Sequence, residues 1–408
     1  MSSKIKTIAA KEVVRSARVP KLRFPEFRGA EPWTLEAGST LFEQINDRNP
    51  ESGLPVLAVT QEHGAIPRDM IDYHVSVTEK SIETYKVVRA GDFIISLRSF
   101  QGGIEYSRYH GICSPAYVIL RRRVKGSDEY FRHYLKTERF VGILTRNLEG
   151  LRDGKMISYS QFSELEIPVP KAAEQKKIAE CLNSLDKLIA SQEAKVGALK
   201  TYKIGLMQQL FPREDETQPR LRFSEFRNAG KWEPKTLAKA CRMQAGKFVS
   251  AADIKEQNSD GLFPCYGGNG LRGFTATYTQ EGTYPLVGRQ GALCGNVKLA
   301  SGRFHATEHA IVATPAQGVD AVWLYYALDL LNLNRFATGQ AQPGLSVDVL
   351  EKVPVTIPED ECEQQRIAAC LCSLDALIAT EAHKLEAFKT HKKGLMQQLF
   401  PPPETVEI

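Results

Sequence analysis

Apolar side chains recur at heptad spacing in two long stretches of the chain, residues 174–212 and 363–401. Successive apolar positions are three, four or seven residues apart, which is typical of a helix with one apolar seam. Polar residues interrupt the seams, at Gln192 and Lys203 and at Glu381 and Lys392. We expect the helices, each roughly 50 Å long, to pair through Ile178, Leu182, Leu185, Ile189, Val196 and Leu199 in the first stretch and Ile367, Leu371, Leu374, Ile378, Leu385 and Phe388 in the second.

The two stretches are copies of one sequence. They lie 189 positions apart, align without a gap and agree at about 25 of 39 positions. A shorter echo precedes each copy, since residues 22–28 (LRFPEFR) recur as residues 221–227 (LRFSEFR). A helix with a single apolar seam is not stable alone in water, so we expect the copies to form an intramolecular antiparallel coiled coil in a pseudo-twofold arrangement. The alternative is that each helix lies on its own domain.

The blocks between the repeats have a different texture. Short β-branched runs such as residues 92–97 (DFIISL) and 309–314 are separated by Gly and Pro, which indicates small β-rich cores. A helical pattern follows in each block, over residues 129–144 and 322–333. The predicted class is α+β, with two similar globular domains separated by the long helices. The expected boundaries are residues 1–170 for the first domain, 171–213 for the first helix, 214–358 for the second domain, and 359–408 for the second helix and tail.

Composition narrows the class of protein. The chain is 42% hydrophobic and 25% charged, which is typical of a globular protein. Eight cysteines without a Cys-x-x-Cys pair argue against a disulfide framework and a zinc site, so we expect no bound metal. No apolar run reaches the ~18 residues that span a bilayer, and the first ten residues lack a signal-peptide core, so we expect a cytoplasmic protein. The net charge of +5 is compatible with a polyanionic partner.

Common catalytic signatures are missing from the sequence. It has no P-loop, no His-Glu-x-x-His and no Gly-x-Ser-x-Gly. Residues 268–273 (GNGLRG) match the dinucleotide fingerprint, but a strand-like run follows where that site needs a helix, so we interpret them as a glycine turn. The tetrapeptide with which amino-methyltransferases hold a flipped base is also missing. These absences mean that the sequence proposes no catalytic residue, while a self-contained methyltransferase or nuclease without these motifs stays open as an alternative that S-adenosylmethionine binding by the isolated chain would test.

The chain resembles the specificity subunit of type I restriction-modification systems over nearly its whole length. The resemblance rests on the doubled arrangement and on the phrase Glu-Gln…Ile-Ala…Leu…Leu-Asp that opens each helix. Supporting phrases are residues 91–95 (GDFII), 114–117 (SPAY), 266–270 (YGGNG) and 287–296 (VGRQGALCGN).

The resemblance implies a DNA-reading, non-catalytic subunit. Each variable block would be a target recognition domain that reads one half of a bipartite site in double-stranded DNA. The helices would fix the gap and dock two adenine methyltransferase subunits, and motor-nuclease subunits would join the restricting complex. No cofactor is expected on this chain, whereas S-adenosylmethionine, ATP and Mg are expected on the partners. Because the blocks differ, the site should be asymmetric. Two DNA-reading domains that bind the same face of a duplex lie about one helical turn apart, ~34 Å centre to centre. Helices of this length can impose that separation.

Base reading favours Arg toward guanine and Gln or Asn toward adenine, on loops held by a rigid core. By this criterion the candidates for DNA binding are Arg98, Ser99, Gln101, Arg152 and Lys155 in the first block and Arg272, Arg289, Gln290, Gln340 and Gln342 in the second. For each one, the alternative is a solvated loop residue or a phosphate contact, which carries no sequence information.

Both helices end in the same residues, Gly-Leu-Met-Gln-Gln-Leu-Phe, before Pro212 and Pro401. Identical exposed ends would form two equivalent docking surfaces for two copies of one partner, and the alternative is a well-packed helix end. A different function also stays open, a scaffold whose variable domains bind other proteins. Salt-dependent affinity for DNA would separate that function from DNA reading.

Overall fold

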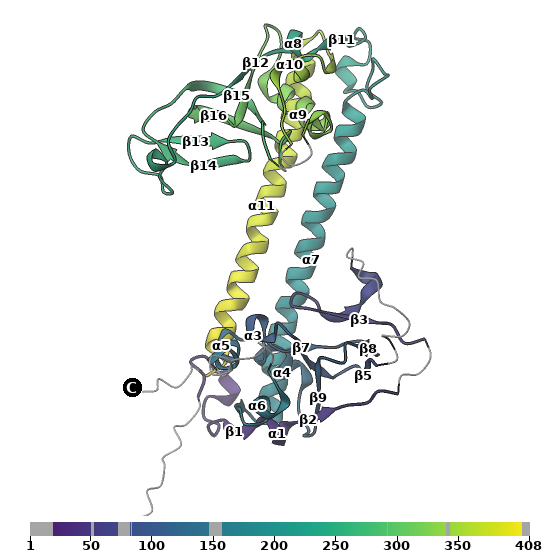
Figure 1. The fold of residues 1–408 in the computed structure, drawn as a ribbon, viewed down its shortest axis with the longest axis vertical. Coiled ribbons are helices and arrows are strands. Elements are labelled where there is room, and N and C mark those ends of the chain that lie inside the picture. The colour runs from purple at the N-terminus through teal and green to yellow at the C-terminus, as the bar shows by residue number, and fades with distance from the viewer. Residues whose placement is uncertain are drawn as a thin grey trace, which may run out of the picture. The chain divides into compact units, whose positions relative to one another are not determined.

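The computed structural model describes residues 19–49, 53–71, 82, 84–146, 157–291, 293–339 and 343–401, and Figure 1 labels their elements. The chain divides into two compact units. Unit 1 comprises Met1–Ser191 with Lys384–Ile408, and unit 2 comprises Gln192–His383. Each unit therefore contains one β-rich domain and one end of each long helix. The four-part division expected from the sequence stays a prediction.

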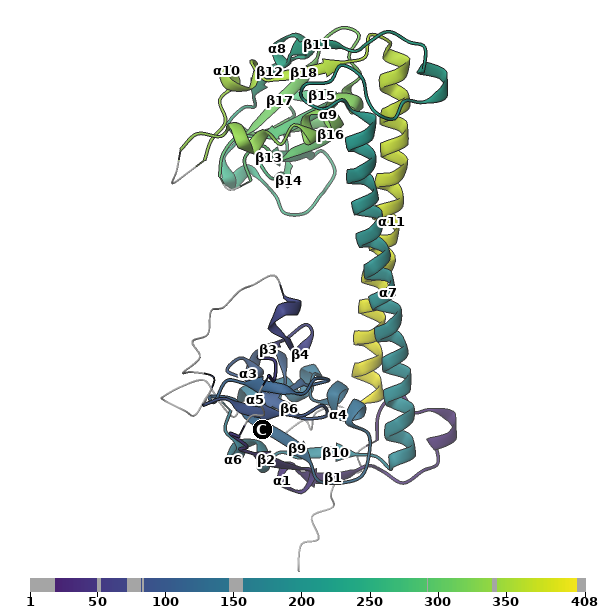
Figure 2. The same ribbon diagram turned by 90° about the vertical axis from the view of Figure 1, so that its right-hand side faces the viewer.

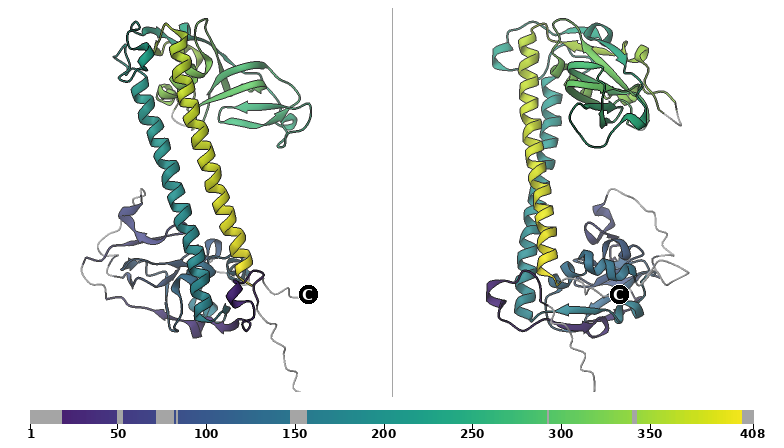
Figure 3. Two further views of the ribbon diagram at one scale, coloured as in Figure 1. Left: turned by 180° about the vertical axis from the view of Figure 1, so that it is seen from behind. Right: turned by 90° about the vertical axis from the view of Figure 1, so that its left-hand side faces the viewer.

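Each repeated stretch lies within one continuous helix, α7 (Ala172–Leu210) and α11 (Glu361–Leu399). In unit 1 the start of α7 lies beside the end of α11, and in unit 2 the end of α7 lies beside the start of α11 (Figures 2 and 3). Within unit 2, Lys195 meets Glu381 whereas Lys203 meets Asp375. Residue numbers thus rise along one helix as they fall along the other, so the helices run antiparallel.

Two polar residues that interrupt the seams meet each other. In unit 2, Nε2 of Gln192 donates to Oε2 of Glu381 at 2.7 Å and to its backbone carbonyl at 2.9 Å. Nζ of Lys195 lies 3.0 Å from the same carboxylate, whose side chain is 5% exposed. Gln192 and Glu381 are equivalent positions of the repeat, 189 residues apart. When two copies of a sequence pair about a pseudo-twofold axis, equivalent residues near the axis lie opposite each other, as Gln192 and Glu381 do.

The other two interruptions form ion pairs. Nζ of Lys203 lies 2.7 Å from Asp375 in unit 2, and Nζ of Lys392 lies 2.5 Å from Asp186 in unit 1. These are one interaction made twice, because Asp186 corresponds to Asp375 and Lys203 to Lys392 in the repeat. The polar breaks in the apolar pattern are thus the places where the helices are joined by hydrogen bonds and charge.

The domain of unit 1 (residues 34–169) has a four-stranded antiparallel sheet of order β2-β9-β6-β7 and three two-stranded ladders, β1-β10, β3-β4 and β5-β8. The sheet strands are β2 (Phe42–Ile45), β6 (Phe93–Ile95), β7 (Glu105–Tyr106) and β9 (Val118–Arg122). The ladder strands are β1 (Thr34–Ala37), β3 (Leu57–Thr60), β4 (Gly64–Pro67), β5 (Lys86–Val88), β8 (Gly111–Cys113) and β10 (Glu166–Val169). The short helices in or beside this domain are η1 (Pro25–Phe27), α1 (Gly38–Leu41), η2 (Arg68–Met70), α3 (Ser99–Gly102), α4 (Asp128–Tyr134), α5 (Glu138–Arg146) and α6 (Tyr159–Ser163).

The domain of unit 2 (residues 233–357) has a six-stranded sheet of order β12-β17-β15-β16-β13-β14 and a ladder β11-β18. Its strands are β11 (Glu233–Thr236), β12 (Cys241–Ala245), β13 (Phe263–Gly267), β14 (Gly270–Thr275), β15 (Gln280–Gly288), β16 (Val297–Ala306), β17 (Ala310–Pro315) and β18 (Pro354–Ile357). Its helices are η3 (Ser224–Phe226), α8 (Leu237–Ala240), η4 (Ala251–Asp253), α9 (Ala321–Leu330), η5 (Leu333–Phe336) and α10 (Val347–Leu350). A hydrogen bond from Tyr326 of α9 to Asp375 connects α9 with α11 (Glu361–Leu399). The glycine run at residues 268–273 turns β13 into β14, as predicted.

The two domains share a frame. Both begin with a strand that pairs with the strand before the long helix, Thr34 with Val169 and Glu233 with Ile357. In both, the next strand pairs with the last sheet strand, since β2-β9-β6-β7 has the connectivity of β12-β17-β15-β16. The additional pair β13-β14 and its parallel contact with β16 occur in unit 2. One α+β fold therefore carries two different sets of loops, as the sequence predicts.

One helix predicted from the sequence is broken in the structure. The pattern over residues 129–144 favours a single helix, but the chain forms α4 and α5 with a turn between them. Oγ1 of Thr137 donates to the carbonyl of Tyr134 and accepts from the amide of Phe140. These side-chain bonds replace helical backbone bonds at the break, a competition in which Thr commonly takes part. The prediction of one continuous helix was wrong.

The short echo fastens each domain to both long helices. Arg23 pairs through two nitrogens with Glu174, each at 2.7 Å, and Arg222 pairs in the same way with Glu363, at 2.7 and 2.6 Å. The amide of Leu22 donates to a carbonyl near the end of α11, and the amide of Leu221 does so near the end of α7. The echo therefore holds the start of one helix beside the end of the other within each unit.

Each unit has one large core that includes the helix ends. In unit 1 the core contains Trp33 and Tyr130, and in unit 2 it contains Trp232 and Trp323. The helix residues in these cores are Ile178, Leu182, Leu399 and Phe400 in unit 1 and Ile367, Leu371, Leu210 and Phe211 in unit 2. The first turns of both helices thus lie on their own domains, while the role of the other predicted seam residues in pairing stays a prediction.

Candidate nucleic-acid interface

The loop after β6 carries the first group of predicted DNA-binding residues. Arg98 and Gln101 are exposed at the two ends of a tight turn that α3 forms. Gly103 ends the turn at φ 84°, where a Cβ would lie 2.2 Å from the carbonyl of Leu135, so the backbone path requires glycine. The turn is therefore seated directly on the domain, with two long polar side chains facing outward.

Ser99 differs from its neighbours. It is 1% exposed, and its hydroxyl accepts a hydrogen bond from the amide of Ser96 at 2.8 Å. A buried side chain in this position shapes the turn and has no surface to offer a base. The structure thus places Ser99 as a support for Arg98 and Gln101 rather than beside them at the surface.

The second predicted loop of this domain begins next to the first. Oγ1 of Thr145, in the last turn of α5, donates to the carbonyl of Phe100 at 2.9 Å. Arg152 and Lys155 follow α5 but lie outside the described residues, so their contribution stays a prediction. The described flank shows that the chain enters their segment beside α3.

The structure also brings Gln61 and Lys136 to the Arg98 turn, two residues that no sequence motif singled out. Nζ of Lys136 donates to the carbonyl of Gln61 at 3.0 Å and forms an ion pair with Glu105. Burial lowers the pKa of Lys136 and raises that of Glu105, while each charge opposes the shift of the other. The side-chain nitrogen Nε2 of Gln61 donates to the backbone carbonyl of Arg98 at 3.4 Å. Because these contacts join segments far apart in the sequence, no local pattern could reveal them.

In the second domain the predicted residues gather around the turn between β16 and β17. The amide of Arg289 donates to the carbonyl of His309 at 2.9 Å. A Cβ on Gly267 would lie 2.9 Å from Cδ of Arg272 and 3.7 Å from the hydroxyl of Thr307. Arg272 and Gln290 are exposed and Arg289 is half-buried. Residues separated by up to 37 positions thus border one turn, residues 307–309, where Glu308 pairs with His309. We call the surface around this turn the β16–β17 face.

The last predicted group borders the same face. Gln340 and Gln342 lie outside the described residues, but their flanks are described. The amide of Gly291 donates to the carbonyl of Pro343, and the amide of Leu345 donates to the carbonyl of Arg289, both at 2.9 Å. The segment that carries the two glutamines therefore enters and leaves beside Arg289 and Gln290.

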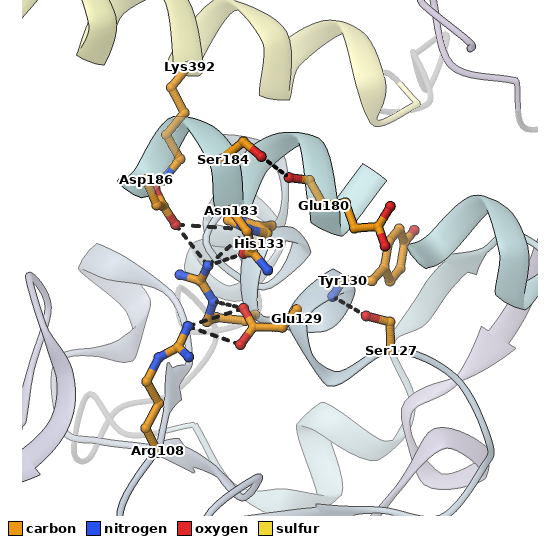
Figure 4. A network of polar contacts seen from close by, with 11 residues as sticks. Arg108, Ser127, Glu129, Tyr130, His133, Glu180, Asn183, Ser184, Asp186 and Lys392 are labelled. Carbon is orange, nitrogen blue, oxygen red and sulfur yellow. Dashed lines mark hydrogen bonds and ion pairs between the residues drawn. The ribbon is translucent and has the colours of Figure 1, made fainter. Parts of the chain in front are cut away.

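A partly buried polar network joins the domain of unit 1 to both long helices (Figure 4). Nη2 of Arg132, on α4, donates to Asn183 at 2.6 Å and to Asp186 at 2.8 Å, and Nε2 of His133 lies 2.9 Å from Asn183. Lys392 of α11 pairs with the same Asp186. Burial alone would raise the pKa of Asp186, but the bonds from Lys392 and Arg132 lower it. One carboxylate thus links α4, α7 and α11.

Unit 2 makes the equivalent joint with different residues. The hydroxyl of Tyr326, on α9, donates to Asp375 of α11 at 2.7 Å, and Lys203 of α7 pairs with the same carboxylate. Burial, followed by its hydrogen bonds to Asp375 and Cys372, raises the pKa of Tyr326, so it stays a neutral donor. The Leu-Asp of each repeat was the sequence signal for this joint. Both domains are therefore held on the helix pair through the same aspartate of the repeat.

The identical helix ends are only partly exposed. Leu210 and Phe211 are 1% and 4% exposed, and Leu399 and Phe400 are 2% and 3% exposed, because they pack into the domain cores. The Gln-Gln pair before each of them is exposed, so docking at the helix ends stays a prediction for these polar residues and not for the buried apolar pair. A different pair of equivalent residues does face outward, Leu188 and Leu377, which are 45% and 43% exposed.

Two further observations concern metal binding and membrane-spanning helices. Among the described residues, no group of three or more His, Cys, Asp or Glu side chains is arranged to hold a metal ion. In the same part of the chain, none of the helices combines the length and apolarity that crossing a bilayer requires. The polar side chains at the surface are suited to hydrogen bonding and charge pairing with a large polar partner.

Comparison with known proteins identifies relatives over both halves. A family model described as the type I restriction modification DNA specificity domain matches twice, over residues 35–200 and 229–390. The specificity subunit of the type I restriction enzyme EcoprrI from Escherichia coli is 42% identical over 144 residues, 35% of this chain and 36% of that relative. The specificity subunit of the MjaVIII enzyme from Methanocaldococcus jannaschii is 25% identical over 352 residues, 80% and 81% of the two chains. The matched part therefore spans about a third of the first relative and most of the second.

Solved structures share the fold. The S subunit of a type I restriction-modification system from M. genitalium superposes with a TM-score of 0.61 at 17% identity, over 94% of this chain and all of that one. A chain from work on complex assembly and conformational transition of the type I R-M system gives a TM-score of 0.55 at 16% identity, over 90% and 97%. At these identities the likeness concerns the fold alone.

Proposed function

The chain belongs to the family of type I restriction-modification specificity subunits, which are non-catalytic components of their complexes, and we propose that it reads an asymmetric bipartite site in double-stranded DNA. Each domain reads one half-site through its own loops. The helix pair fixes the gap between the half-sites. The complex methylates one adenine in each half-site through two methyltransferase subunits.

One observation carries the proposal. The two domains share the frame strands, the Arg–Glu clamp of the echo and the aspartate joint to the helices. They differ in the loops that present Arg98 and Gln101 in one domain and Arg272, Arg289 and Gln290 in the other. A protein that keeps its scaffold and varies two outward faces is suited to reading two different DNA sequences. The scaffold positions the domains on the duplex, whereas contacts to the bases determine which sequence is read.

We place the methyltransferase contacts on the outer faces of the helices. Leu188 and Leu377 are repeat equivalents and both are exposed. The repeat positions one and two helical turns before these leucines, on the same side of each helix, also carry identical residues. They are Ser184 and Ser373, and Cys181 and Cys370. Two matching helix faces, each with one exposed leucine, are suited to two copies of one subunit. In this assembly S-adenosylmethionine belongs to the methyltransferases, and ATP and Mg belong to the motor-nuclease subunits.

DNA binding by the chain with its methyltransferase tests the proposal. We expect affinity for a duplex that contains the methylated motif to exceed that for random duplex and to fall steeply as salt rises, because phosphate contacts release counterions. The motif itself comes from sequencing the methylated bases of a host that carries both subunits.

The matched control is a duplex with one half-site scrambled. Binding should weaken when either half-site is scrambled. Each of the two scrambled duplexes then measures the contribution of one domain to binding. A complex without salt-dependent affinity for any duplex would contradict the proposal and favour a scaffold whose domains bind other proteins.

A further inference from the structure

Phe248 is the most exposed large apolar side chain among the described residues, with 76% of its surface accessible. It is the third residue after β12 and lies in a loop rather than on a helix. Exposed single apolar residues are common, so exposure alone gives it no role. Three further features indicate a functional role for Phe248.

The backbone that carries Phe248 is fixed. The amide of Gly246 donates to the carbonyl of Ala310 at 2.9 Å, and the amide of Lys247 donates to that of Ala306 at 2.8 Å. Nε2 of His305 lies 3.1 Å from the carbonyl of Lys247. A Cβ on Gly246 would lie 2.2 Å from the carbonyl of Ala306, so only glycine fits this approach. Phe248 therefore projects from a rigid base, which lowers the entropy cost of placing it against a partner.

This base is part of the β16–β17 face. Lys247 contacts Ala306 on one side of the turn at residues 307–309, and Arg289 contacts His309 on the other. Arg272 lies beside the same turn next to Thr307. Phe248 thus follows a residue that contacts this turn, on a face to which Lys247, Arg272 and Arg289 belong, and the positive charges of these three are suited to phosphate or guanine.

The first domain has a different residue at the same place. The carbonyl of Leu41 accepts from the amide of Arg123 and that of Ala240 from the amide of Ala316, so β2 and β12 begin at equivalent residues, Phe42 and Cys241. Counted from these starts, Phe248 corresponds to Asn49, which is exposed as well. A position that is outward-facing in both domains but differs in chemistry is typical of a residue that distinguishes targets.

We propose that Phe248 is an apolar base-contact residue of the second recognition domain, packing its ring against a base of that domain's half-site. This inference rests on the proposed function. Phenylalanine cannot hydrogen-bond a base edge, but it can contact a thymine methyl group or wedge against a base step. Phe248 therefore supplies a selectivity that the neighbouring Arg and Gln residues cannot.

The test compares Phe248→Ala with wild type in the full complex of chain and methyltransferase, on duplex that contains the methylated motif. We expect affinity to fall roughly 5- to 150-fold, the range for one lost base-pair contact. The dependence on salt should keep its slope, because no phosphate charge is lost. Lys247→Ala should instead reduce that slope by about 1. Scrambling the half-site of the second domain should abolish the effect of Phe248→Ala.

Controls separate the possible failures. Leu221→Ala removes another exposed apolar side chain of unit 2, outside the face, and should leave affinity unchanged. Thermal unfolding of Phe248→Ala should match wild type, because the ring makes no core contact. Equal binding by Phe248→Ala and wild type would overturn this inference while leaving the proposed function intact. Loss of thymine-to-uracil sensitivity in Phe248→Ala would identify the methyl group as its contact.

Discussion

Single residues fasten each domain to the helices, and the buried Arg23–Glu174 pair is the strongest instance in unit 1. Its side chains are 7% and 2% exposed, and both guanidinium branches are engaged. Arg23→Ala leaves Glu174 buried without its charge partner. We expect the free energy of unfolding to fall by about 3–5 kcal/mol, measured by denaturant unfolding.

Lys171→Ala provides the control for Arg23→Ala. It breaks the ion pair between Lys171 and Glu31, whose side chains are 75% and 77% exposed. Solvent screens such a pair, so stability should remain close to wild type. Equal losses from the two substitutions would show that the Arg23 pair contributes no more than a surface contact.

A second residue-scale prediction concerns pH. Burial, followed by the neighbouring Arg132, lowers the pKa of His133 to about 4, against 6.5 for a free histidine. Between these values the unfolded chain binds the proton and the folded chain does not, so stability is lost as pH falls from about 6.5 toward 4. Asp186 also faces the ring, but it stays charged in this window because its pKa is lowered.

By linkage we expect unit 1 to lose about 2 kcal/mol between pH 7 and pH 5 through His133. Denaturant unfolding at the two pH values measures the loss, and His133→Asn should remove it. His63→Asn serves as the control, since that side chain is 58% exposed. A wild-type stability that does not change between pH 7 and pH 5 would contradict a buried neutral histidine.

At the scale of elements, the Gln192–Glu381 contact sets which positions of the helices face each other. Sliding one helix by a heptad would leave the Glu381 carboxylate without its amide donor in an apolar seam. Gln192→Glu puts a second carboxylate there. We expect stability to fall by about 1–3 kcal/mol at pH 7, with part of the loss recovered in mild acid as one carboxyl takes up a proton.

The same substitution at an exposed position of α7, Gln208→Glu, is the matched control. It adds the same charge without an opposing carboxylate, so its unfolding curve should overlay that of wild type. If Gln192→Glu behaved like Gln208→Glu, the polar contact would have no part in aligning the helices.

Another element-scale prediction follows from the equivalent exposed leucines. Leu188→Ala should leave one methyltransferase bound in the complex, Leu377→Ala should do the same, and the double variant should bind none tightly. Each lost leucine contact should weaken its site roughly tenfold or more. Sedimentation or mass photometry measures the stoichiometry. Tyr202→Ala, at an exposed position whose repeat equivalent is His391, should retain both subunits.

What the sequence could predict depended on whether the signal was local. The long helices followed from heptad spacing, and the shared frame followed from repeated order. The break at Thr137 did not, because a Thr side chain in a helical pattern reveals its bonds to Tyr134 and Phe140 only in three dimensions. Ser99 was selected for its loop, but its hydroxyl is turned inward to Ser96. Phe248 was missed because its exposure depends on contacts with β16 and β17.

At the scale of the whole molecule, duplication explains why one chain has two similar units. Each unit takes the start of one helix and the end of the other, so neither domain is complete without both copies of the repeat. The Arg–Glu clamp and the Lys–Asp pairs of the helices are made twice from equivalent residues, and the frame strands pair in the same way in both domains. The outward loops differ. The repeated parts account for assembly and the variable parts account for what is read.

Exchanging one domain tests this account most directly. Residues 1–170 are replaced by the corresponding block of another member of the family, and the methylated bases of a host carrying the hybrid and the methyltransferase are sequenced. We predict that one half-site of the motif changes, while the other half-site and the gap between them stay as in wild type. A hybrid that changes both half-sites, or that keeps both half-sites and alters the gap, would contradict the assignment of reading to the domains and spacing to the helices.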